Sequence, residues 1–110
     1  MDERGKKVFD IKQGAVEKDV SAKAVIGVLD VLTLSYGFPK TETEKLKEYT
    51  LEAVASSEIT GLREEDRASF IEKISEVVKN SLANSTMEKT AVEEFIRYFR
   101  SMLENDFTLY

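Results

Sequence analysis

The chain has 110 residues, of which 42% are apolar and 34% are charged, which is the size and composition of a single globular domain. It contains no cysteine and no histidine, and this excludes disulfide scaffolds, thiol catalysis, histidine-based triads and the usual zinc sites. The net charge of −5 favours solubility and argues against a dedicated nucleic-acid-binding protein, which usually carries a basic surplus.

The N-terminal segment differs in pattern from the rest of the chain. It is charged and lacks the apolar run of a signal peptide, so we expect a cytoplasmic protein. Phe9 and Ile11 share one face of a short alternating stretch that has no second strand to pair with. We therefore divide the chain into an N-terminal arm (1–18), flexible or docked on the bundle or a partner, and a helical bundle domain (19–110).

The first predicted helix spans residues 20–36 and ends at Gly37. It is apolar around most of its circumference, because Val25, Ile26, Leu29 and Leu34 fall partly or wholly outside the stripe that an ordinary core face would occupy. Either this helix lies centrally under the other helices, or its second face packs on another chain, and the two explanations are equally open. The expected core stripe consists of Val20, Ala24, Val28, Val31 and Leu32.

Three further stretches have helical periodicity, over residues 42–56, 63–83 and 86–104. The first and the last of them begin with the spacing of a capping box, at Thr41–Glu44 and Ser85–Glu88. Short connections between helices favour antiparallel neighbours. The predicted fold is therefore all-α, an antiparallel four-helix bundle.

The C-terminus carries an unusual concentration of large apolar residues. Phe107, Leu109 and Tyr110 follow the polar residues 104–106, where the last helix is expected to end. Such residues either fold back on the bundle or anchor a partner.

Motifs that carry chemistry are missing from the sequence. The five glycines do not have the spacing of a phosphate-binding loop, and Gly27 is expected at a close contact between helices. Adjacent acids such as Glu93 and Glu94 point about 100° apart on a helix and do not converge on one ion. Asp30 is the one acid within a strongly apolar segment, and we expect it on the solvent side. We predict no catalytic residue, no cofactor, no metal site and no enzymatic activity.

These features favour a non-enzymatic protein–protein interaction module, acting as a homodimer or as an adaptor or accessory subunit of a larger complex. The alternative is an accessory subunit that contacts nucleic acid through basic residues near an aromatic side chain. No membrane contact is expected. The predicted partner-binding residues are Phe9, Ile11, Val25, Ile26, Leu29, Phe107 and Tyr110. The nucleic-acid alternative would use Lys6, Lys7, Arg97 and Arg100.

Overall fold

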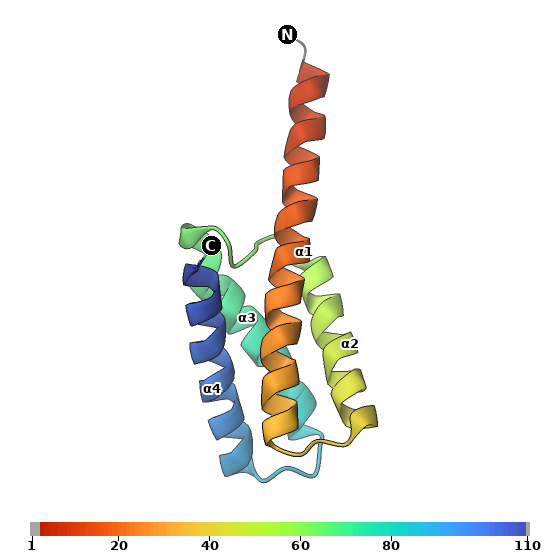
Figure 1. Cartoon of the computed structure of the whole chain (residues 1–110), viewed down its shortest axis with the longest axis vertical. Helices are drawn as coiled ribbons and strands as arrows, with labels where there is room; N and C mark the ends of the chain where they lie inside the picture. Colours follow the sequence, from red (N-terminus) through yellow and green to blue (C-terminus); the bar gives the residue numbers. More distant parts are fainter. Residues whose placement is uncertain (1–2, 110) are drawn as a thin grey trace.

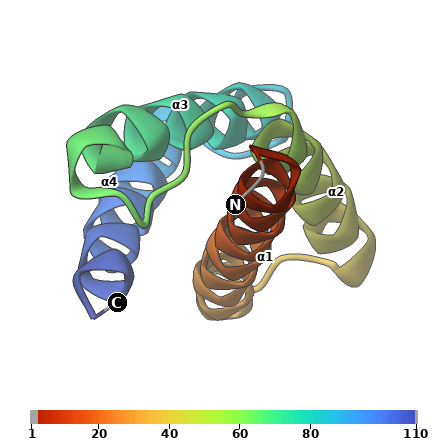
Figure 2. The ribbon, with the colours of Figure 1, turned by 90° about the horizontal axis from the view of Figure 1, so that it is seen from above.

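Four α-helices pack as an antiparallel bundle in which each helix contacts its two neighbours. The structure is a computed structural model that describes the backbone of residues 3–109 and the side chains of residues 16–109. Consecutive helices run in opposite directions (Figure 1), and the view from above shows them arranged in chain order around the bundle (Figure 2). The described part of the chain contains no strand, and the predicted all-α four-helix bundle is confirmed. The helices are α1 (Glu3–Ser35), α2 (Lys40–Ser56), α3 (Glu64–Ala83) and α4 (Lys89–Thr108).

The first helix is longer than the sequence predicted. α1 begins at Glu3 rather than near Val20, and its N-terminal part extends past the ends of the other three helices (Figure 1). From Glu3 onward, the backbone of the expected arm is therefore helical. Apolar periodicity could not reveal this, because the segment has few apolar residues. Its Glu, Lys and Gln residues nevertheless readily propagate a helix that packing has already nucleated.

The end of α1 is set by a glycine, as the sequence predicted. Gly37 has a φ of +69°, in the left-handed region that costs glycine nothing. Its N–H donates to the carbonyl of Leu34 (3.1 Å), and the N–H of Phe38 donates to the carbonyl of Thr33 (2.9 Å). This pair of bonds is a Schellman motif, which satisfies carbonyls left free at a helix end. The chain then reverses, and Pro39 leads into α2.

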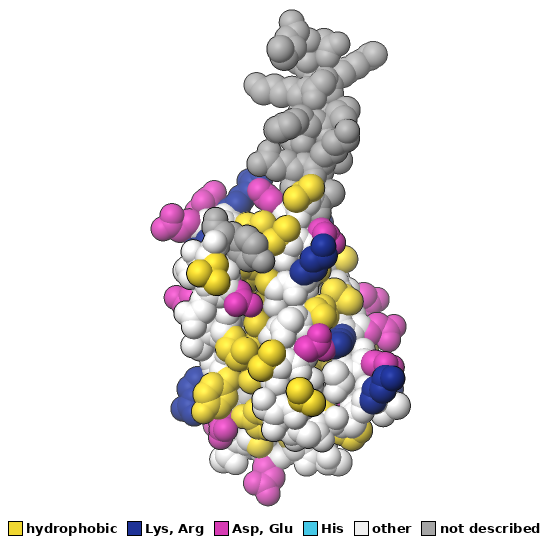
Figure 3. Space-filling model, in the orientation of Figure 1, with side chains coloured by type: hydrophobic (Ala, Val, Ile, Leu, Met, Phe, Trp, Pro, Cys, Tyr) yellow, Lys and Arg dark blue, Asp and Glu magenta, His cyan; other side chains and the backbone are white. Residues whose placement is uncertain are grey.

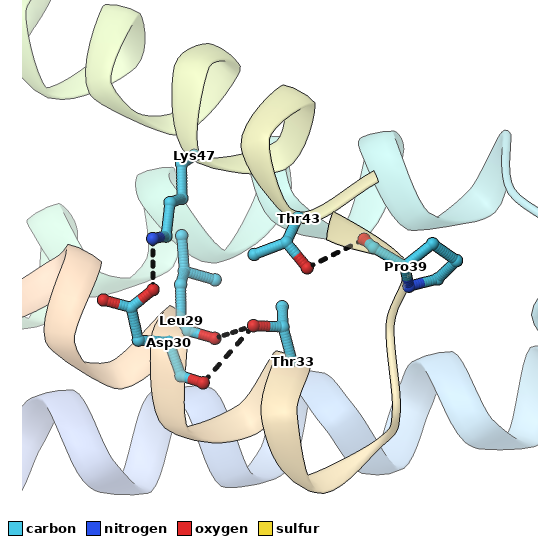
Figure 4. A network of polar contacts seen from close by, with 6 residues as sticks. All are labelled: Leu29, Asp30, Thr33, Pro39, Thr43 and Lys47. Carbon is cyan, nitrogen blue, oxygen red and sulfur yellow. Dashed lines mark hydrogen bonds and ion pairs between the residues drawn. The ribbon is translucent and has the colours of Figure 1, made fainter. Parts of the chain in front are cut away.

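The two predicted capping boxes do not form. Within the described residues, neither α2 nor α4 has a side-chain hydrogen bond at its N-cap. The hydroxyl of Thr43 donates back to the carbonyl of Pro39 (3.2 Å; Figure 4). Before α4, the hydroxyl of Ser85 accepts a bond from the N–H of Met87 (3.2 Å). Hydroxyl groups thus bond locally in both turns, which competes with the capping geometry.

The core face of α1 differs from the predicted one. Val31, expected in the core, is 51% exposed, whereas Val25 and Leu29, expected on a second face, are fully buried. α1 contacts both α2 and α4, so its buried arc lies between those two neighbours. The burial of Val25 and Leu29 is thus explained within one chain, without a partner. From residue 16 onward, the buried apolar residues of α1 are Ala24, Val25, Val28, Leu29 and Leu32.

The last helix continues beyond its predicted end. α4 runs through the polar residues 104–106 to Thr108. Phe107 therefore extends the buried stripe of Phe99 and Leu103 at four-residue steps, and its own side chain is fully buried. Of the two alternatives left open by the sequence, Phe107 belongs to the core of the bundle.

A glycine in the connection between α2 and α3 makes room for the Phe107 ring. A Cβ atom on Gly61 would lie 2.3 Å from that ring, closer than any real contact. On its other side the Phe107 ring meets Phe70 edge-on, with centroids 5.7 Å apart and an interplanar angle of 76°. This contact holds the C-terminal turn of α4 against the start of α3.

Candidate functional site

One face of α1 exposes apolar side chains, on the side of the molecule that α1 and α4 form (Figure 3). Val16 is 60% exposed and Leu34 is 83% exposed, and Val31 lies between them on the same side of the helix. A helix turns by about 100° per residue, so these positions lie opposite the buried Val25 and Leu29. We call this surface the α1 face. It consists of Val16, Val20, Lys23, Gly27, Asp30, Val31 and Leu34.

Gly27 occupies the middle of the α1 face. It lies within α1, where a glycine costs about 1 kcal/mol relative to alanine. Its φ is not in the left-handed region, so the backbone does not require a glycine there. Among the described residues outside its own stretch of helix, no atom lies within 4 Å of the position of an added Cβ. The close helix contact that the sequence predicted at Gly27 is therefore not made within the described part of the chain.

Two charged side chains of opposite sign flank the glycine. Lys23 forms an ion pair with Asp19 one turn earlier (3.2 Å), and both side chains are largely exposed. Asp30 forms an ion pair with Lys47 of α2 (Figure 4). The side chain of Asp30 is 51% exposed, which confirms that it lies on the solvent side of α1. Next to it, the hydroxyl of Thr33 donates to the carbonyls of Asp30 (3.3 Å) and of the preceding residue (2.7 Å).

The structure corrects three of the seven predicted partner-binding residues. Val25, Leu29 and Phe107 are fully buried in the core and offer no surface to a partner. Ile26 is partly buried and packs against the same core. The side chains of Phe9, Ile11 and Tyr110 lie outside the described residues. Among the residues of α1 whose side chains are described, the exposed large apolar ones are instead Val16, Val31 and Leu34.

Among the described residues, the surroundings of Arg100 are not a basic patch. That residue lines a depression of about 360 Å³ between α3 and α4, in which three acidic side chains accompany two basic ones. The guanidinium carbon of Arg97 lies 5.7 Å from the centroid of the neighbouring Tyr98 ring. The side chains of Lys6 and Lys7 lie outside the described residues. The charged residues around Arg100 are Glu64, Arg67, Glu72 and Glu104.

A tyrosine joins the end of α1 to α4. The hydroxyl of Tyr36 donates to a carboxylate oxygen of Glu94 (3.0 Å), and its ring packs on Phe95 with centroids 5.3 Å apart. Burial raises the pKa of the Tyr36 phenol, and the hydrogen bond to Glu94 raises it further. The phenol is therefore held in its protonated form, which suits a structural link better than proton abstraction.

A groove of about 560 Å³ lies between α2 and α3, near the turn that follows α1. Its lining mixes apolar and polar side chains, among them Phe38, Leu46, Tyr49, Val77, Asn80 and Leu82.

Among residues 16–109, no three acidic side chains are grouped so as to hold a metal ion. No helix in the part of the chain described here combines the length and apolarity that crossing a bilayer requires.

Comparison of the chain with models of known protein families, with curated proteins and with solved structures found no match.

Proposed function

We propose that the protein is a non-enzymatic protein–protein interaction module and that the α1 face is its binding surface. The observation that supports this most directly is the exposure of Leu34, which is 83% accessible on a helix whose opposite side lies in the core. Removing apolar surface from water is favourable by about 25 cal/mol for each Å², and the part that exceeds the cost of association contributes to affinity. A partner that packs on the α1 face would therefore gain affinity from Leu34 together with Val16 and Val31.

The arrangement of charges agrees with an interface of this kind. Lys23 and Asp30 lie among the apolar residues of the α1 face, and both keep part of their side chains in solvent. Polar groups around a small apolar centre fix the orientation of a partner and limit nonspecific association.

A photo-reactive cross-linker placed at residue 34 of the full chain, with an identical probe at residue 109 as control, tests the proposal. Leu109 is a matched control because it is 84% exposed but lies at the end of α4. In an extract of the source cells, we expect protein cross-links at residue 34 well above those at residue 109. Equal yields at the two positions would contradict the proposed binding surface.

Binding to nucleic acid is the alternative that the same preparation can test. The acids around Arg100 lead us to expect no salt-sensitive binding of single- or double-stranded nucleic acid at about 50 mM salt. Binding that weakens steadily as salt rises, and that is lost when Arg97 and Arg100 are replaced by alanine, would favour the alternative.

A further inference from the structure

We infer that the partner on the α1 face is a second copy of this chain, packed antiparallel about a two-fold axis at Gly27. This inference rests on the proposed function, because it names the occupant of the same surface. In such a dimer the same patch is used by both copies, so the patch must be complementary to itself.

Two of the apolar residues of the α1 face, Val20 and Leu34, lie symmetrically about Gly27. Val20 precedes the glycine by two helical turns, and Leu34 follows it by the same distance. An antiparallel pair centred on Gly27 therefore places Val20 of one copy opposite Leu34 of the other, twice. Leu34 is 83% exposed in the single chain, and the dimer would cover it.

The charges select the antiparallel arrangement. Lys23 lies one turn before Gly27 and Asp30 almost one turn after it, so an antiparallel pair brings Lys23 of each copy close to Asp30 of the other. A parallel pair would instead set Lys23 against Lys23 and Asp30 against Asp30, and such like-charge contacts are unfavourable. The ion pair of Lys23 with Asp19 lies at the surface, where such pairs contribute little to stability and are easily exchanged.

The glycine itself agrees with a close approach of two helices. Gly27 is exposed, and within the described chain nothing occupies the space where its Cβ would be. Small residues let two helix backbones approach closely, which increases the contact between the side chains on either side. A second copy packed at this point would explain the glycine at position 27, because nothing in the described chain requires a glycine there.

The mass of the full-length chain is the first test. We expect a monomer–dimer equilibrium in sedimentation velocity at concentrations up to about 1 mM. Leu34→Asp should raise the dimer Kd by about tenfold or more, and the equally exposed Leu109→Asp should leave it unchanged. A chain that stays monomeric at every concentration would overturn the inference.

Alanine at position 27 separates the fold from the interface. In dilute solution, where the chain is monomeric, Gly27→Ala should raise the unfolding midpoint, because alanine is the better helix former and has room for its methyl group. The same variant should weaken the dimer. A Gly27→Ala chain that dimerises as well as the wild type would overturn the close approach at this residue.

Introduced cysteines report the direction of packing, because the natural chain has none. In an antiparallel dimer the two copies of residue 34 are about 21 Å apart along the axis, too far for a disulfide. We expect the Gly27→Cys variant to form disulfide dimers by itself. The Leu34→Cys variant should form them only when it is mixed with the Val20→Cys variant. Disulfide dimers of Leu34→Cys alone would indicate parallel packing and overturn the two-fold arrangement.

The cross-linking experiment distinguishes this inference from the proposed function. A monomeric chain that still cross-links a foreign protein at residue 34, and not at residue 109, would overturn the second copy as partner and leave the α1 face as a binding surface. A monomeric chain with equal cross-linking at both positions would overturn both.

Discussion

Replacing Phe107 by alanine tests whether the C-terminal turn belongs to the core. The side chain is fully buried, meets Phe70 edge-on at 5.7 Å and fills the space left by Gly61. Removing such a ring loses its transfer free energy and leaves a cavity, so Phe107→Ala should lower the free energy of unfolding by about 3–5 kcal/mol. Phe107→Leu fills much of the space and should cost only about 1–1.5 kcal/mol.

Urea denaturation followed by far-UV circular dichroism measures these differences. The expected loss for Phe107→Ala corresponds to a fall of about 2 M in the urea midpoint. Leu109→Ala is the control, because Leu109 is 84% exposed and its replacement should change stability by less than about 0.5 kcal/mol. Equal midpoints for Phe107→Ala and Leu109→Ala would show that Phe107 does not pack in the core, and the position of the last turn of α4 would be wrong.

Three further changes probe other contacts. Gly61→Ala should destabilise the fold by about 1–3 kcal/mol through overpacking, and a smaller cost in a Phe107→Leu background would confirm the clash in a double-mutant cycle. Tyr36→Phe should flatten the loss of the free energy of unfolding that sets in as the pH rises above about 10. The reason is that a pKa raised above 10.0 stabilises the fold fully below pH 10 and progressively less as the pH rises through the folded-state value. Equal pH dependence of unfolding in the two proteins would refute this. Asp30→Asn removes the ion pair with α2 and should cost less than about 1 kcal/mol in low salt and nothing measurable in 1 M salt.

Much of the fold follows from local pattern. α3 and α4 each carry one apolar stripe, and a single stripe can face the core in only one way. α3 accordingly begins within one residue of its predicted start and ends at its predicted last residue, Ala83. Gly37 ends α1 because its left-handed backbone lets the N–H groups of residues 37 and 38 bond to the last carbonyls of the helix. The groups involved all lie within residues 33–38, so this helix end also follows from local sequence.

The candidate site could be predicted only in part. The surplus of apolar residues in α1 indicated that this helix has more than an ordinary core face, and the sequence also marked Gly27 as a residue suited to close helix contact. Which side of α1 is exposed could not be deduced, because Val25 and Val31 are chemically alike and both lie on a helix that is apolar nearly all round. Leu34 lies outside the predicted core stripe, but so do Val25 and Leu29, which are buried, so the sequence pattern did not distinguish the exposed residue from the buried ones.

Packing between distant segments decided the rest. Phe107 is a core residue because α4 continues through three polar residues and because Gly61, far away in the sequence, leaves space for its ring. Val25 is buried and Val31 is exposed because α2 and α4 cover one arc of α1 and leave the other open. Periodicity along the chain determines which residues can share a helix face, since it depends only on the geometry of the helix. Which face is covered is a property of the neighbouring helices, and the tertiary structure alone determines it.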